Sequence, residues 1–88
     1  MRFWFKEMHQ AHLVKETTVE DYEEKNRTKK VFDAIETACR EFDLATPVWL
    51  EANIKEFKRH GKVRFNQDNF VETIDFDFLE LSVLEEDF

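Results

Sequence analysis

Apolar and polar side chains alternate at the N-terminus with the period of two that is typical of β-strands. Within residues 2–8, Phe3 and Phe5 share one face, and residues 13–20 are again rich in β-branched types. These two runs predict a β-hairpin. The link at 9–12 contains no Gly, Asn or Asp, so we expect a four-residue loop rather than a tight two-residue turn.

The apolar spacing from Asn26 to Asp43 changes to the three-to-four-residue period of an amphipathic helix. Asn26 or Thr28 can cap the N-terminus of this helix. The buried stripe is predicted to contain Val31, Ile35, Ala38 and Phe42, with Phe32 and Cys39 alongside. No other element has so clear a pattern.

A second helix is predicted to begin at Pro47, because Thr46 is a suitable N-cap and proline fits the first helical position. Gly61 is expected to end this helix. Its inward stripe is predicted to be Leu50, Ile54 and Phe57. A three-residue connection at 44–46 favours helices that are neighbours and pack on a common sheet or on each other.

The C-terminal third is less regular. Residues 63–65 predict a short edge strand, and 66–69 predict a turn or a cap. Apolar residues then alternate with carboxylates over 74–78, and the alternation slips by one residue at 78–79. Such a slip turns every side chain over, so we expect the strand to be bulged or broken there.

The sequence allows two interpretations of the secondary structure of this region. We expect a short helical turn or irregular segment over 68–73 and a strand over 78–85. The alternative is a third helix through Phe70, Ile74, Phe78 and Leu81, which the β-branched and aromatic content disfavours. The whole pattern predicts a single α+β domain over 1–88, with a small antiparallel sheet, made of the N-terminal hairpin and C-terminal strands, covered on one face by two helices.

Composition supports one small domain and excludes several functional classes. A chain of 88 residues cannot form two cores, and its ten Phe raise the apolar area that one core can bury. A single Gly and a single Pro exclude a glycine-rich phosphate loop and a dinucleotide fingerprint. The charged residue Lys6 follows the first five residues, so the stretch before it is too short for the apolar core of a signal peptide. No apolar run is long enough to span a bilayer. We expect a cytoplasmic protein.

Charge is distributed unevenly along the chain. Residues 65–88 carry eight carboxylates and no Lys or Arg, whereas residues 27–64 carry a net charge of +3. The C-terminal segment therefore accounts for the whole net charge of −7. This polarity favours recognition of a partner over chemistry. A symmetric homodimer is one hypothesis, in which 55–64 of each copy contacts the acidic end of the other.

The basic segment 55–64 is the first candidate binding site. Its cations are interleaved with Phe57 and Phe65, a composition also found in nucleic-acid-binding strips. A solvated helix face explains the same cations without any ligand, and an acidic chain repels phosphate at long range, so nucleic acid ranks below a protein partner. The candidate contact residues are Lys55, Lys58, Arg59, Lys62 and Arg64, with Trp49 as an aromatic anchor that could instead belong to the core.

An acidic face is the second candidate and contains Asp75, Asp77 and Glu80. These carboxylates could guard an edge strand against pairing with other chains. Calcium or magnesium binding is disfavoured, since the glycine of a calcium loop is absent and apolar residues separate the carboxylates. His9 and His12 lack a third metal ligand nearby, so no metal and no cofactor are expected.

Cys39 lies on the predicted apolar stripe, where a small buried side chain is common. No His or basic residue is placed to activate its thiol, and one cysteine cannot form an internal disulfide. No pairing of a nucleophile with a base stands out, and we predict that the protein is not an enzyme.

Seven short segments resemble a family of small uncharacterised cytoplasmic proteins from Gram-positive anaerobic bacteria. They lie at 30–32, 41–44, 47–50, 54–60, 68–70, 74–77 and 85–87. The resemblance covers roughly 28–87, and it implies a compact bacterial domain without an assigned activity. From the residues, we predict a non-catalytic intracellular protein-interaction module or small regulatory protein with a protein partner; the alternative is nucleic-acid binding through 55–64.

Overall fold

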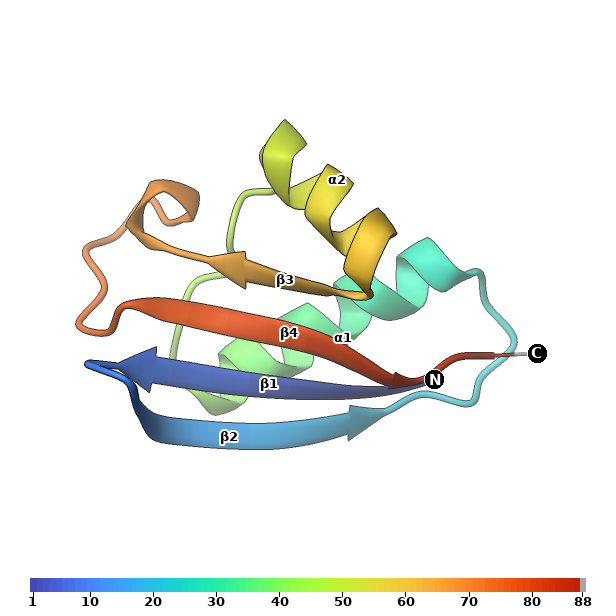
Figure 1. Ribbon diagram of the computed structural model, residues 1–88. Helices are drawn as coiled ribbons and strands as arrows, with labels where there is room; N and C mark the ends of the chain where they lie inside the picture. The colour runs from blue at the N-terminus through green and yellow to red at the C-terminus, as the bar shows by residue number, and fades with distance from the viewer. Residues whose placement is uncertain (88) are drawn as a thin grey trace.

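The computed structural model describes residues 1–87, which form a four-stranded antiparallel sheet with two helices packed against it (Figure 1). The strands are β1 (Arg2–His9), β2 (His12–Glu20), β3 (Lys62–Phe65) and β4 (Phe78–Glu85), in the order β2-β1-β4-β3. The helices are α1 (Arg27–Glu41) and α2 (Glu51–His60), and a short 3₁₀ helix, η1 (Gln67–Asn69), follows β3. The expected α+β fold is confirmed.

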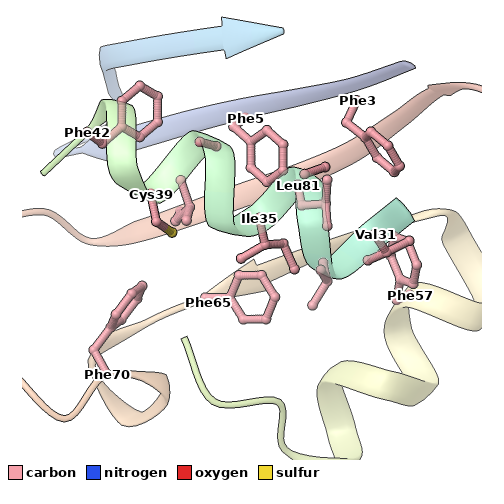
Figure 2. Close-up of a cluster of buried hydrophobic side chains, with 14 of the residues drawn as sticks. Phe3, Phe5, Val31, Ile35, Cys39, Phe42, Phe57, Phe65, Phe70 and Leu81 are labelled. Carbon is pink, nitrogen blue, oxygen red and sulfur yellow. The ribbon is translucent and has the colours of Figure 1, made fainter. Parts of the chain in front are cut away.

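The sheet and both helices share one core. Three strands each contribute two side chains that are fully buried: Phe3 and Phe5, Val63 and Phe65, and Leu79 and Leu81. The members of each pair are two residues apart, so all six point to the same face of the sheet. α1 lies across that face, and α2 lies beside the edge strand β3 (Figure 1). Figure 2 shows Phe57 of α2 beside Val31 of α1, where the two helices reach the same core.

The link between β1 and β2 is a two-residue turn, so the expected four-residue loop is wrong. Gln10 and Ala11 have φ values of +49° and +63°, although neither is a glycine. A contact from a distant segment holds this left-handed turn in place. The Gln10 backbone N–H donates to the Asp77 carboxylate (2.7 Å), and the Asp77 backbone N–H donates to the Met8 carbonyl (2.8 Å). The preferences of turn residues consider only 9–12 and so could not predict a turn held by a contact with Asp77.

α1 begins as expected, with the Asn26 side chain accepting a hydrogen bond from the Lys29 backbone N–H (2.8 Å). The stripe of Val31, Ile35, Ala38, Cys39 and Phe42 is buried. Phe32 is an exception, because half of its side chain is exposed, whereas Lys30 and Ala34 are buried instead. The inward face of α1 is thus rotated slightly away from Phe32.

α2 begins at Glu51, four residues later than predicted, and Thr46 and Pro47 do not start it. The Val48 backbone N–H donates to the Asn69 carbonyl (2.7 Å), which ties the preceding segment to η1 in an extended conformation. The Asn53 side chain then accepts from the Leu50 backbone N–H (2.9 Å) at the helix start. The connection between the helices is therefore residues 42–50, not three residues. Gly61 ends α2 with φ +68°, as expected.

The predicted inward stripe of α2 is mostly wrong. Phe57 is buried, but Leu50 is 44% exposed and Ile54 is 41% exposed. The reason is the position of α2 outside the edge strand β3, where one row of side chains is enough to reach the core. The remaining apolar side chains of α2 face solvent.

The strand expected at 78–85 is confirmed, and so is the break before it, because residues 70–77 are irregular. The alternative helix through Phe70, Ile74, Phe78 and Leu81 does not form. Asn66 caps η1 by accepting from the Asp68 backbone N–H (3.0 Å). Phe70 and Phe76 pack edge to face across the irregular segment, with ring centroids 6.0 Å apart. Residues 63–65 lie in the edge strand β3, as expected.

Candidate functional site

A groove of about 230 Å³ opens between the first turns of α1 and the exposed side of α2. We call it the helix groove. Its lining residues are Arg27, Thr28, Val31, Phe32, Trp49, Ile54, Phe57 and Lys58. The floor connects directly with the core, since Val31 and Phe57 are buried members of it.

Trp49 lines the groove and packs on residues of α1, α2 and β3. Its ring makes edge-to-face contacts with Phe65 (5.0 Å between centroids), Phe57 (5.5 Å) and Phe32 (6.1 Å). Aromatic pairs in this geometry contribute about 0.5–1.5 kcal/mol each beyond their buried area. The Trp49 indole N–H is buried and has no hydrogen-bond partner among residues 1–87. Trp49 therefore combines the two alternatives given for it: it packs on the core, and it also lines the groove.

The two sides of the groove carry apolar side chains that the fold leaves in solvent. Phe32 of α1 is 51% exposed, and Ile54 of α2 is 41% exposed. The chain neighbours of Trp49, Val48 and Leu50, are also about half exposed. Apolar side chains gathered around a depression, rather than scattered singly, are typical of an interaction surface.

The charges in the groove have one sign. Arg27 and Lys58 are its charged lining residues, and no carboxylate of residues 1–87 lines it. The Arg27 guanidinium lies over the Phe57 ring (5.1 Å) and makes two hydrogen bonds to Glu86 (3.0 and 2.9 Å), which fix its position. Lys58 has no carboxylate within ion-pair distance in the part of the chain that the structure describes. Its ammonium is free to bind.

The basic residues predicted as one site lie on three different surfaces. Lys58 and Trp49 meet in the helix groove. Lys55 and Arg59 line a shallow depression on another side of α2. Lys62 and Arg64 lie in β3, and the pairing of Arg64 with Glu80 (3.0 Å) places it on the outer face of the sheet. The predicted set is therefore only partly brought together.

Nucleic-acid binding through 55–64 loses its stacking platform in this structure. Phe57 and Phe65 were the aromatic residues interleaved with the cations, and both are buried. Buried rings cannot stack on bases. The exposed cations of the segment remain, so the electrostatic part of that hypothesis still stands.

The three carboxylates predicted as an acidic face are not equivalent. Glu80 is only 5% exposed and lies between Lys6 (2.9 Å) and Arg64 (3.0 Å). Asp77 holds the hairpin turn, and Asp75 is exposed. β4 has strands on both sides, so Glu80 does not guard a sheet edge, and Asp75 and Asp77 lie in the irregular segment before β4. The prediction of an acidic face is wrong for Glu80, because the sheet places its charge between two cations.

The environment of Glu80 favours its ionised form. Burial alone would raise its pKa, but hydrogen bonds from Lys6 and Arg64 outweigh burial and lower the pKa below its usual value. Charged hydrogen bonds of this kind are stronger than neutral ones. The outer face of the sheet is therefore cross-linked by charge between β1, β4 and β3.

The last acidic residues pair with the start of α1. Glu86 binds Arg27, and Asp87 binds both Lys30 (2.6 Å) and the Met1 amino group (2.8 Å). The first turn of α1 contains no acidic residue, and its cations oppose the helix dipole. The hydrogen bond from Lys30 lowers the pKa of Asp87, and that from Arg27 lowers the pKa of Glu86. The acidic end therefore supplies the negative charge that this helix start lacks.

The residues considered for chemistry are not arranged for it. Burial raises the pKa of the Cys39 thiol to about 11, which keeps it protonated at neutral pH. His9 lies 3.3 Å from Asp77, and no group of three metal-ligating side chains occurs within residues 1–87. Neither of the two helices in these residues has the length and apolar character needed to cross a membrane.

Comparisons of the chain with models of known protein families, with curated proteins and with solved structures found no match. The resemblance to proteins of Gram-positive anaerobic bacteria therefore stays a prediction.

The sequence analysis missed three groove residues. It placed Phe32 and Ile54 in the core and gave Arg27 no role. The sequence contains no local signal that separates these residues from core residues, because helical periodicity gives the face on which a residue lies and not what packs against it.

Proposed function

We propose that the protein is a non-catalytic intracellular interaction module that binds a segment of a partner protein in the helix groove. The observation that carries this proposal is the half-exposed apolar pair, Phe32 and Ile54, facing a floor that belongs to the core. Burying such side chains on binding contributes roughly 25 cal/mol for each Å² removed from water. A rigid floor also reduces the entropy lost on binding.

The size of the groove favours a side chain over a metabolite. Small-molecule sites usually enclose about 300–1,000 Å³ and contain several convergent polar groups. The helix groove, at about 230 Å³, is smaller and mainly apolar. It matches the pockets at protein interfaces that take one or two aliphatic or aromatic anchors.

A random peptide-display selection on the immobilised protein tests the proposal. Peptides selected on the wild type should be lost from the variant Ile54→Asp, which puts a charge in the groove wall. Val71→Asp is the matched control, since Val71 is 93% exposed and lies outside the groove. Both variants should keep wild-type circular dichroism and thermal unfolding.

Two results count against the proposal. The first is a selection that yields no peptide binding in solution, and the second is a set of peptides whose binding falls equally in Ile54→Asp and Val71→Asp. In either case the helix groove is not a protein-binding site.

A further inference from the structure

We propose that the segment bound in the helix groove is an acidic amphipathic helix. This inference rests on the proposed function and names the chemistry of the partner. It depends on two features: a cation at the groove, Lys58, that has no ion-pair partner within residues 1–87, and a lining that contains no residue of β1–β4.

The charge of the groove is opposite to that of the protein. The chain has 20 Asp and Glu residues and 13 Lys and Arg residues, yet among residues 1–87 two cations and no carboxylate line the groove. Arg27 is held by Glu86, whereas Lys58 has no ion-pair partner within residues 1–87. A carboxylate beside the apolar anchor can therefore pair with Lys58 without displacing a contact of the fold.

The walls of the groove favour a helix over an extended peptide. An extended peptide needs free backbone groups for strand addition, and a helix needs none because its own hydrogen bonds are internal. Two sides of the groove are helices. The remaining side is formed by Trp49, and no residue of β1–β4 lines the groove, so the groove offers no strand edge to an extended peptide. Recognition must therefore depend on side chains, which suits an amphipathic helix with apolar anchors one turn apart.

Two synthetic peptides with the same apolar positions test this inference. Each has Leu or Phe at helical spacing of i, i+3 and i+7; one carries Glu at its other charged positions and the other carries Lys. Trp49 lines the groove and reports binding by its fluorescence, and Trp4→Phe removes the second tryptophan, which lies in β1. In this background we expect the acidic peptide to bind at least about tenfold more tightly than the basic one.

Charge reversal identifies the contact. Lys58→Glu should weaken binding of the acidic peptide by about tenfold and strengthen binding of the basic peptide. Arg59→Glu is the matched control, because it makes the same change of charge at the next residue of α2, which does not line the groove. It should change both affinities by much less. A smaller difference between the peptides at high salt would support the same charge contact.

Three results overturn the inference. If both peptides bind equally, or if Lys58→Glu and Arg59→Glu have the same effect, the groove binds protein without preferring acid, and the proposed function survives. If sedimentation shows self-association that Ile54→Asp abolishes, the occupant is a second copy of this chain. If neither peptide binds and display also yields none, the proposed function fails as well.

Discussion

The acidic C-terminal region and the basic end of α2 have opposite charge and opposite roles. Asp77, Glu80, Glu86 and Asp87 each make a hydrogen bond or ion pair to a residue distant in the sequence. The cations at 58, 59 and 62 have no carboxylate partner within residues 1–87. The carboxylates therefore stabilise the fold, and these cations remain available for binding.

Position in the fold explains the difference better than composition does. β4 is an interior strand, so cations of both neighbouring strands reach Glu80. The chain after β4 runs to the start of α1, where Arg27 and Lys30 lie. α2 lies outside the edge strand β3, and most of its surface faces solvent. Within one molecule, Arg64 and Glu80 form an ion pair between 55–64 and the acidic C-terminal region, and the contact expected between two copies stays a prediction.

Of the tests of this contrast between the two regions, acidification should give the largest change in the free energy of unfolding. The pKa values of Glu80 and Glu86 are lowered in the folded protein, so their stabilisation is present above about pH 4.5 and is lost as the pH falls through the folded values. After discounting for solvent screening, we expect the free energy of unfolding to fall by about 2–3 kcal/mol between about pH 5 and pH 2. Urea unfolding at each pH measures it.

Glu7 provides an internal control for this titration. It is buried, its nearest cation is Lys15 at 4.0 Å, and burial raises its pKa. The charge of Glu7 therefore destabilises the fold as the pH rises through its raised pKa. Glu7→Gln should increase stability at neutral pH and make the loss of stability on acidification steeper.

A variant lacking the cations at 58, 59 and 62 should lose as much stability on acidification as the wild type. A flat pH profile in the wild type would contradict the structural role of the acidic end.

Neutralising Glu80 alone should give the next largest effect. Glu80→Gln keeps the shape of the side chain but removes the charge between Lys6 and Arg64, and we expect a loss of about 1–2 kcal/mol. Asp75→Asn is the matched control, since Asp75 is exposed, and its effect should be below about 0.5 kcal/mol. Equal losses in thermal unfolding would mean that the pairing of Glu80 contributes nothing.

Asp77 should have a smaller effect that acts through the hairpin turn. Asp77→Ala removes the acceptor of the Gln10 N–H and should cost about 1 kcal/mol. Ala11→Gly should recover about the same amount in that background, because glycine adopts the positive φ of position 11 without strain. Chemical unfolding of the two single variants and the double variant measures both changes. No recovery in the double variant would show that the turn is not where Asp77 acts.

The smallest effect on stability should come from the free cations. Changing Lys58, Arg59 and Lys62 to Ala together should alter the free energy of unfolding by less than about 0.5 kcal/mol, because none makes an ion pair in residues 1–87. Thermal unfolding measures it. A loss as large as that of Glu80→Gln would remove the contrast between the two regions.

The elements that the sequence predicted correctly are those with a sufficient local cause. α1 has a complete apolar period and its own cap at Asn26, and these features act within the helix. Gly61 ends α2 because it readily adopts a left-handed conformation. The slip at 78–79 marked the start of β4, since side-chain parity is fixed along a strand.

The errors occur where a distant segment outweighs a local preference. The hairpin turn depends on Asp77, and the segment before α2 is held extended by a hydrogen bond to Asn69. The sequence named Lys58 and Trp49 for the candidate site but assigned Ile54 to the core. Whether an apolar residue on a helix is buried depends on what packs against it, and periodicity gives only the face on which it lies.

The sequence by itself determined that this chain forms two helices and antiparallel strands around one aromatic core, because side-chain periods and caps act within a few residues. It also determined the excess of carboxylates at the C-terminal end. Only the tertiary structure decided which charges are paired and where the apolar groove opens. Ion pairing and burial depend on distances between segments far apart in the chain, and the arrangement of β4, α1 and α2 sets those distances.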